Sequence, residues 1–226
     1  MVKTLKQRRQ KVLEHIGRYR LTLRDVISKV FLDGKDPSNL LRQMVDEGLV
    51  ISHNRRSGKG LDGGLSYYQL TREGARQAGV PSSRAKSLDN RVPQYLAFLA
   101  FCCLGDKRRE MMEPEQFTQC FPGCGDVSKE FYAVEKSPNG PLFYRLIFVG
   151  SANAPHYIKR LSEAIEKAES IPELSLLLSK GFFLPTLVVG EEGQVEQFKE
   201  LTKKSSLTPK RHRRNIRFHT MSPKPS

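Results

Sequence analysis

Helical spacing of apolar residues marks three segments near the start of the chain. Between Lys3 and Gly17 these residues fall on one side of a helix, which we expect Gly17 to end. A second stripe follows at i, i+3, i+4 and i+7, with Thr22 as the expected N-cap: Leu23, Val26, Ile27 and Val30. Asp36 as N-cap and Pro37 at the first helical position then open a third helix. Its inward-facing residues are Leu40, Leu41, Met44 and Val45.

A hairpin is predicted after the third helix, which Gly48 ends. The segments LVISH and LSYYQL predict two strands, and the glycine-rich residues 54–64 between them predict the loop that joins them. A further helix is expected to begin near Thr71 or Arg72. The order helix, helix, turn, helix, hairpin, helix is typical of a winged helix-turn-helix, in which the hairpin is the wing.

Basic residues and glycines make up much of the predicted wing loop. Arg55, Arg56 and Lys59 would lie along a phosphate backbone, and the glycines would let the loop turn sharply and approach closely. This role explains why a basic, glycine-rich loop is followed so soon by a strand.

The third helix would enter the major groove in this fold. Its outward-facing residues are Ser38, Asn39, Arg42, Gln43 and Asp46. Arg pairs well with guanine and Asn or Gln with adenine, so Arg42, Asn39 and Gln43 are the expected base-reading residues. The alternative is an ordinary solvated helix face.

A second domain follows a linker predicted over residues 79–91, which are rich in Ser, Pro and charge. Residues 92–203 predict a small α/β domain, which we expect to mediate dimerisation, as a homodimer, or partner contacts. Its segments are a buried helix RVPQYLAFLAFCCL, two strands EFYAVEK and LFYRLIFVG joined by a turn, an amphipathic helix PHYIKRLSEAIEKAES, a core strand FFLPTLVVG and a helix VEQFKELTKK. The predicted fold class is α+β, with the winged helix in residues 1–78.

Positive charge lies at the two ends of the chain, whose net charge is +14. Residues 1–91 carry 19 Lys and Arg against 9 Asp and Glu, residues 92–200 carry 11 against 15, and residues 201–226 carry 8 against none. Such asymmetry is typical of a polyanion partner. A basic amphipathic helix with Trp or Phe for membrane insertion is not found, so the expected partner is double-stranded DNA and not a membrane. An adaptor whose basic ends bind RNA or another acidic partner is an alternative.

The basic tail, residues 204–226, is predicted to be a second, non-specific DNA contact. Its central cations are Lys210, Arg211, Arg213 and Arg214, and their mutual repulsion would leave the segment mobile without a polyanion. The alternatives are a solubilising tail and a closing edge strand at NIRFHTM.

The four cysteines are Cys102, Cys103, Cys120 and Cys124. We expect reduced and mostly buried thiols, because the spacing differs from the C-x2-C pairs of zinc sites, which remain the alternative. The N-terminus lacks the apolar stretch of a signal peptide and no segment reaches 18 apolar residues, so a cytoplasmic protein is expected.

The N-terminal motifs resemble those of the replication-relaxation family, proteins of plasmids and other mobile elements. The matching residues are LLRQMVDEGLVISHNRR followed by GGLSYYQLTREGARQAG, which are similar to that family's recognition helix, wing and closing L-T-x-x-G. The order of elements in the second half also resembles that family more loosely. The resemblance implies DNA binding in plasmid replication or mobilisation, or in transcriptional control.

The second half is also similar in element order to restriction-endonuclease-like folds, so a nuclease or mobilisation enzyme with an atypical site is the alternative function. Such enzymes need an acidic residue on one strand and Glu-x-Lys or Asp-x-Lys on the next. Glu-x-Lys is absent from the sequence and Asp-x-Lys occurs at residues 33–35, before the third helix. Asp126, Glu130 and Glu135 are the conceivable catalytic carboxylates, and we expect a solvated strand face instead. His156 is expected at the surface or as a cap, and we predict no catalytic residue, metal or cofactor.

Overall fold

The computed structural model has a mixed α+β fold and divides into two compact units, residues 1–99 and 100–226. It describes residues 5–54, 66–150, 153–189, 192–204, 212 and 215–220. The segment predicted as a linker, residues 79–91, contains two short 3-10 helices, η1 (Ser82–Ala85) and η2 (Asp89–Arg91). The division between units falls within the next helix, α5 (Val92–Cys103).

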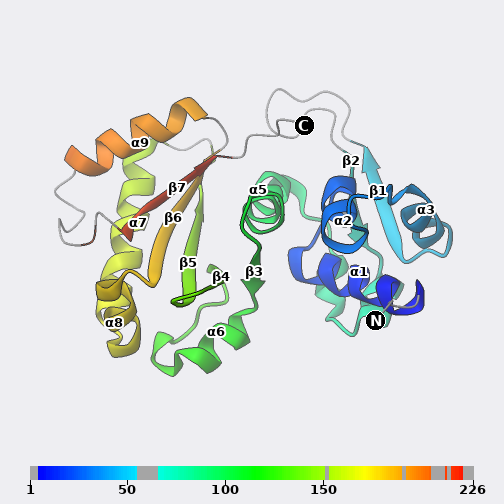
Figure 1. The fold of residues 1–226 in the computed structure, drawn as a ribbon, viewed down its shortest axis with the longest axis horizontal. Coiled ribbons are helices and arrows are strands. Elements are labelled where there is room, and N and C mark those ends of the chain that lie inside the picture. Colours follow the sequence, from blue (N-terminus) through cyan, green and yellow to red (C-terminus); the bar gives the residue numbers. More distant parts are fainter. Residues whose placement is uncertain are drawn as a thin grey trace. The chain divides into compact units, whose positions relative to one another are not determined.

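Unit 1 contains the helices and the hairpin that the sequence predicts (Figure 1). Its elements are α1 (Leu5–Tyr19), α2 (Arg24–Phe31), α3 (Ser38–Asp46), β1 (Val50–Asn54), β2 (Ser66–Leu70) and α4 (Arg72–Ala78). β1 and β2 are antiparallel, with Val50 opposite Leu70 and Asn54 opposite Ser66. The apolar faces of all three N-terminal helices, both strands and α4 contribute to one core.

Three expected helix boundaries in unit 1 are wrong: the end of α1, the start of α2, and the start of α3, whose N-cap is Pro37 and not Asp36. Gly17 does not end α1 but lies buried inside it, where a Cβ would come within 3.0 Å of Val80, and the helix ends two residues later. Thr22 does not cap α2, whose N-cap is Leu23. Thr22 instead pairs with Tyr68 of β2 through two backbone hydrogen bonds of 2.9 Å, because its fully buried backbone needs partners and the sheet edge supplies them.

The L-T-x-x-G segment closes unit 1 through backbone contacts. Thr71 caps α4 by accepting a hydrogen bond from the Gly74 N–H at 2.9 Å, and its hydroxyl donates to the Gly48 carbonyl at 2.6 Å. A Cβ at Gly74 would lie 1.9 Å from the Leu49 carbonyl oxygen. The absence of a side chain at Gly74 therefore lets α4 pack directly on the backbone that leads into β1.

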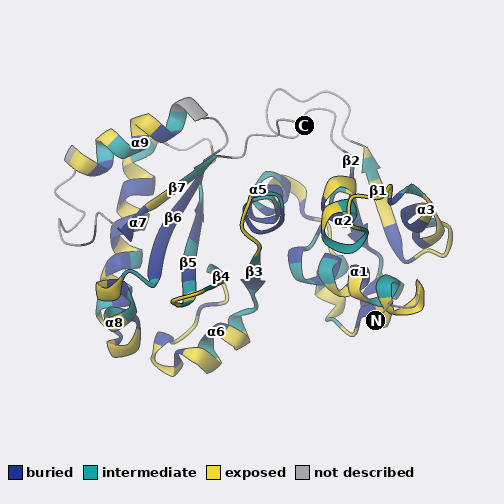
Figure 2. Ribbon diagram, viewed as in Figure 1, coloured by how far each residue is buried: buried dark blue, intermediate teal, exposed yellow. Residues whose placement is uncertain are grey.

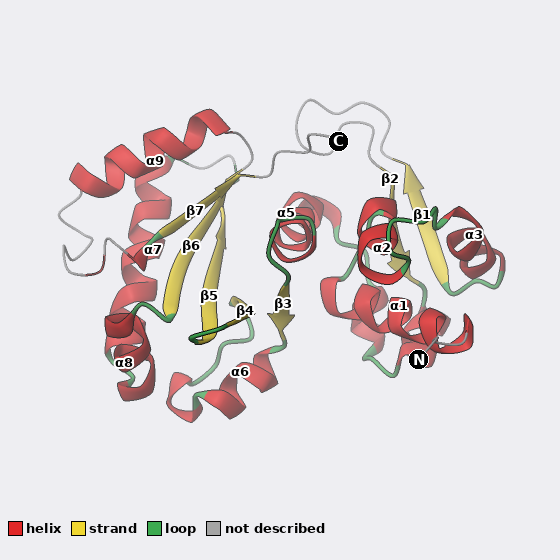
Figure 3. Cartoon of the chain, in the orientation of Figure 1, coloured by secondary structure: helices red, strands yellow, loops and turns green. Residues whose placement is uncertain are grey.

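Unit 2 is built around a five-stranded mixed sheet in the order β3-β4-β5-β6-β7 (Figure 3). β3, β4 and β5 form an antiparallel meander, whereas β5, β6 and β7 are parallel. The elements are β3 (Arg109–Met112), α6 (Pro114–Cys120), η3 (Pro122–Cys124), β4 (Phe131–Ser137), β5 (Gly140–Phe148), α7 (Ala154–Glu169), α8 (Pro172–Lys180), β6 (Phe183–Val189), α9 (Glu192–Lys204) and β7 (Arg217–Thr220). The hairpin, the amphipathic helix, the core strand and the last strand are confirmed, while β3, α6 and α8 were not predicted.

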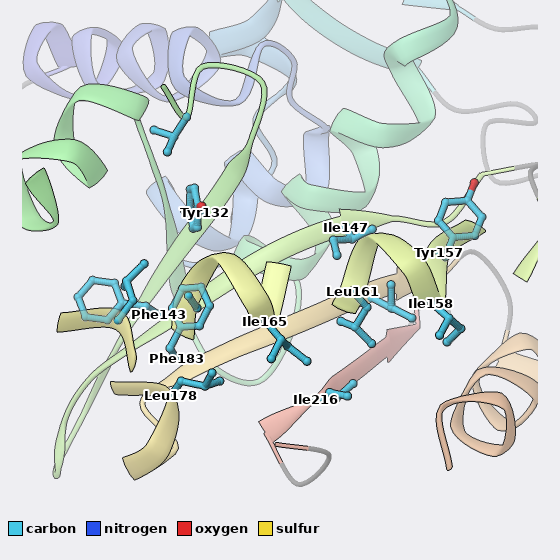
Figure 4. Packing of buried hydrophobic residues seen from close by; sticks show 14 of the residues in the cluster. Tyr132, Phe143, Ile147, Tyr157, Ile158, Leu161, Ile165, Leu178, Phe183 and Ile216 are labelled. Carbon is cyan, nitrogen blue, oxygen red and sulfur yellow. The ribbon is translucent and has the colours of Figure 1, made fainter. Parts of the chain in front are cut away.

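Helices α7, α8 and α9 cover one side of this sheet. The apolar stripe of α7 includes Ile158, Leu161 and Ile165, which point toward the strands (Figure 4). Every residue of β6 is buried (Figure 2), as expected for the central strand of a parallel group. Among the described residues, no helix has both the length and the apolar character needed to cross a membrane.

The described part of the tail is folded onto unit 2. Ile216 lies in the core and β7 pairs with β6, which confirms the alternative of a closing edge strand. His212 is buried against Glu169, with 2.7 Å between Nε2 and Oε1, and the Asn215 amide donates to the Leu178 carbonyl. The expectation of a mobile tail is therefore wrong for residues 212 and 215–220. Lys210, Arg211, Arg213 and Arg214 lie outside the described residues.

Candidate nucleic-acid interface

The two sides of α3 differ in burial as its apolar spacing predicts. Leu41 and Met44 are buried in the unit 1 core. On the opposite side Ser38 is half-buried, and the other polar side chains are exposed: Asn39, Arg42, Gln43 and Asp46. The sequence therefore placed the outward side of α3 correctly, and the structure brings these side chains together on one helix.

Asn39 and Arg42 contact each other one turn apart. The Arg42 guanidinium donates to the Asn39 side-chain carbonyl over 2.8 Å. This contact fixes the amide orientation, so the Asn39 NH2 group points away from Arg42 and can donate to an acceptor. Asp46, one turn after Arg42, places a carboxylate on the same side of the helix. A ligand of this surface would meet donors near the start of α3 and an acceptor near its end.

The beginning of α3 carries a charged contact that the sequence pattern did not reveal. Arg24, the first residue of α2, donates to the Asp36 carboxylate at 2.8 Å and to the Ser38 hydroxyl at 2.6 Å. Asp36 also accepts from the Ser38 N–H at 3.0 Å, which is the capping contact expected of it, although α3 begins one residue later than predicted. The hydrogen bonds from Ser38, together with Arg24, hold the pKa of Asp36 below its usual value. Arg24 therefore adds an exposed cation beside Ser38.

A groove of about 410 Å³ borders the same helix. It is lined by Gln43 of α3, by Glu47 just after α3, and by residues of α1 and α4: Leu5, Lys6, Arg9, Gln10, Leu13 and Gln77. Arg9 and Glu47 form an ion pair across it, with 2.8 Å between Nη1 and Oε1. Gln43 therefore also lines this groove beside α1, at the edge of the exposed side of α3.

The hairpin leaves little aromatic surface for base stacking. Tyr67 is 7% exposed and stacks on His53, with 4.8 Å between ring centroids, and Tyr68 packs against the core. Burial lowers the pKa of His53, so this imidazole is neutral near pH 7. Single-stranded RNA recognition usually needs exposed aromatic rings, so these contacts disfavour the RNA-binding alternative. Arg55, Arg56 and Lys59 lie outside the described residues.

In unit 2, Glu130 lies in a half-buried ionic cluster on the side of the sheet that α7 covers. Lys167 of α7 and Arg145 of β5 lie 2.9 and 3.3 Å from its carboxylate, and the Tyr132 hydroxyl donates to it. Burial alone would raise the pKa of Glu130, but Arg145, Tyr132 and Lys167 outweigh it and lower the pKa. Burial and the bond to Glu130 raise the pKa of Tyr132.

Glu135 lies in a second cluster and is 3% exposed, so the expectation of a solvated strand face is wrong for this residue. Its carboxylate is 2.9 Å from Arg109 and 3.3 Å from Lys107, and it accepts a 2.7 Å hydrogen bond from the Tyr144 hydroxyl. The Arg109 guanidinium also contacts the ring of Phe101, at 4.4 Å from its centroid. Burial would raise the pKa of Glu135, but these donors lower it.

The two carboxylates do not form a pair that could hold a metal ion. Side chains alternate along β4, so Glu135 lies on the side opposite Tyr132, whose hydroxyl bonds Glu130. Asp126 is exposed and accepts from the Ser128 N–H at 2.8 Å. Across the described ranges, no three His, Cys, Asp or Glu side chains are grouped as a metal site would require.

The cysteines and His156 occupy the positions expected for structural residues. Cys102, Cys103 and Cys124 are buried and Cys120 is exposed, all as free thiols. Burial raises the pKa of the Cys124 thiol, which makes it a poor nucleophile near pH 7. His156 is exposed in the first turn of α7, where its N–H donates to the Asn153 cap at 3.2 Å.

Comparison with protein-family models, with curated proteins and with solved structures gives no match for this chain. The resemblance to the replication-relaxation family therefore stays a prediction that rests on the quoted motifs.

Proposed function

We propose that this protein binds double-stranded DNA in a sequence-specific manner through unit 1, acting as a winged helix-turn-helix. The observation that carries the proposal is α3, a short helix with a buried apolar side and an exposed side that carries Asn39, Arg42 and Gln43. Arg and Asn side chains offer the hydrogen-bond patterns that distinguish bases in the major groove. Arg24, at the start of α2, would contact the backbone beside the groove, since the first helix of this motif crosses it.

The hairpin supports the same proposal. The Thr22–Tyr68 bridge adds a third short strand segment to β1 and β2, so the sheet ties the α1–α2 connection to the hairpin that follows α3. The loop between β1 and β2 contains Arg55, Arg56 and Lys59, which we propose as phosphate contacts. Lys210, Arg211, Arg213 and Arg214 are proposed as further, non-specific contacts.

The process we propose is replication or mobilisation of a plasmid or other mobile element, or control of its genes, in the cytoplasm. The motifs from Leu40 to Arg56 and from Gly63 to Gly79 support it through their resemblance to replication-relaxation proteins. Unit 2 would act without catalysis, through dimerisation or partner binding, because its strand carboxylates are engaged by Arg and Lys side chains.

The test is to select bound fragments from the host genome, sequence them and measure the affinity of variants for the selected site and for random DNA. Arg42→Ala should weaken binding to the selected site by about 1 to 3 kcal/mol and change binding to random DNA little. The matched control is Arg72→Ala, which removes the same charge from an exposed position of α4 in the same unit. If Arg42→Ala and Arg72→Ala bind the selected site equally well, α3 does not read the bases.

A further inference from the structure

Three exposed cations of unit 2 come together at one corner of the sheet, although they are far apart in sequence. Arg108 precedes β3, Lys136 lies near the end of β4, and Lys180 is the last residue of α8. Arg109 pairs with Glu135 at the end of the β3–β4 ladder, and Arg108 and Lys136 are the residues next to that last pair on the two chains. We call these three residues the basic corner.

Backbone contacts place Lys180 beside the other two. Lys136 pairs with Pro141 of β5, next to Gly140, and a Cβ at Gly140 would lie 3.8 Å from the Phe182 ring. The Phe143 N–H donates to the Phe182 carbonyl at 2.8 Å, two residues after Lys180. Since neighbouring chains in a sheet are about 4.8 Å apart, the basic corner spans roughly 15 Å across three such spacings.

The cations of the basic corner differ from three lysines on α7 and α9 of the same unit. Lys159, Lys199 and Lys203 each have a carboxylate partner three or four residues away. By contrast, within the described part of the chain neither Arg108, Lys136 nor Lys180 has a carboxylate within ion-pair distance. Of the acids nearby, Glu135 is buried between Arg109 and Lys107, whereas Asp106 and Glu110 are exposed.

We propose that the basic corner binds the phosphate backbone of duplex DNA, as a second contact surface separate from α3. Like charges placed opposite each other on adjacent strands repel, and phosphates would relieve that repulsion while releasing counterions. Duplex DNA carries about one charge per 1.7 Å of its axis, so a corner about 15 Å wide meets several phosphates. The choice of DNA as the polyanion rests on the proposed function. The arrangement of the three cations does not depend on that function.

The experiment compares two triple variants of the full chain. Arg108→Gln, Lys136→Gln and Lys180→Gln together remove the basic corner. Lys159→Gln, Lys199→Gln and Lys203→Gln together remove the same charge from ion-paired helix positions. Binding to a random-sequence duplex is measured at several salt concentrations, with circular dichroism to verify folding. The slope of log affinity against log salt should fall in magnitude by about 2 to 3 units in the corner variant and by less than about 1 in the control.

The outcomes separate this proposal from the proposed function. Equal slopes for the two triple variants overturn the basic corner while leaving α3 as the site of sequence reading, which Arg42→Ala tests. No DNA binding by the wild type overturns both. If the corner variant loses affinity for an RNA duplex of the same sequence but not for DNA, the corner is an RNA surface and the proposal is wrong.

Discussion

The two units place their charged side chains differently. Among the described residues of unit 1 the ion pairs are exposed or partly exposed. The Arg24 and Asp36 side chains are 50% and 67% exposed, those of Arg76 and Glu73 are 75% and 43% exposed, and those of Arg9 and Glu47 are 25% and 50% exposed. Unit 2 also has exposed ion pairs, on α7 and α9, but it contains a buried one as well, in which the Arg109 and Glu135 side chains are 14% and 4% exposed. Exposed ion pairs contribute little to stability, whereas a buried carboxylate depends strongly on its partners.

This difference separates charges that are available to a partner from charges that maintain the fold. Exposed cations of unit 1 such as Arg42 are accessible to solvent and, under the proposed function, would be accessible to phosphate. In unit 2, by contrast, Arg145 and Lys167 are already paired with Glu130, and Arg109 is already paired with Glu135. The net charge of a segment therefore says less about binding than the exposure of each cation does, and unit 2 exposes cations at the basic corner as well as on α7 and α9.

The largest effect is expected from Glu135→Ala. It leaves Arg109 without its carboxylate partner beneath the sheet, and removing one member of a buried ion pair typically destabilises by about 3 to 5 kcal/mol. Hydrogen exchange by mass spectrometry should show faster exchange in β3, β4 and β5. Glu163→Ala, which removes an exposed acid of α7, is the control and should change stability by about 0.5 kcal/mol or less. Equal effects of the two variants would show that the Glu135 cluster is not a stabilising feature.

The next largest effect is expected from Gly74→Ala, which should destabilise unit 1. The added Cβ meets the Leu49 carbonyl oxygen, a backbone atom that can move only with β1, and overpacking of this kind costs about 1 to 3 kcal/mol. Exchange should rise first in α4 and β1. Arg72→Ala in the same helix should leave the stability within about 0.5 kcal/mol of the wild type. Unchanged exchange in Gly74→Ala would mean that α4 can shift away from the backbone at no cost.

Local patterns predicted most elements because their causes are local. The short apolar segments EFYAVEK and LFYRLIFVG and the helical stripe of α7 correspond to β4, β5 and α7. β3 was missed because its four residues, Arg109–Met112, carry two charges and show no alternation of apolar and polar positions. The helix end predicted at Gly17 was wrong because this glycine lies inside α1, where its lack of a side chain allows close packing against Val80.

The candidate site was predicted in part for a similar reason. The outward side of α3 follows from apolar spacing alone, and it is exposed as expected. Arg24 was missed because its contact with Asp36 and Ser38 depends on how α2 and α3 pack together. Glu135 was misread because its partner Arg109 lies in another strand, and strand alternation gives no information about such pairs.

Acid should destabilise unit 2 through its carboxylates. The pKa values of Glu130 and Glu135 are lowered in the folded state, so their stabilising contribution is complete above the usual pKa of 4.5 and is lost as pH falls through the folded values. The free energy of unfolding should therefore decrease below about pH 4.5, and Glu135→Gln should flatten this dependence.

Unit 1 provides the contrast for the acid experiment. Hydrogen bonds from Arg76 and Gln77 hold the pKa of Glu73 at about 2, but this carboxylate is exposed and screened by salt. Adding salt at pH 3 to 4 should therefore change exchange in α4 more than in β4. If β4 is the more salt-sensitive segment, the Glu135 cluster is open to solvent and the comparison between units fails.

The smallest effect is expected in a test for nuclease activity, in which we predict that the protein does not cleave DNA. The meander β3–β5 with β6 parallel to β5 keeps the element order that prompted the enzyme alternative. Glu130, which precedes β4, and Glu135 within β4, however, have different partners on opposite sides of the sheet, and each is bound by two cations. A metal ion would have to displace those cations and would still meet a single strand carboxylate, so we expect no cleavage of phosphodiesters. Supercoiled plasmid incubated with purified protein and Mg²⁺ or Mn²⁺ should stay supercoiled, as in a protein-free control. Nicking that Glu130→Gln or Asp126→Ala abolishes, and that Asp106→Asn leaves intact, would instead establish unit 2 as a nuclease and end its assignment as a binding unit.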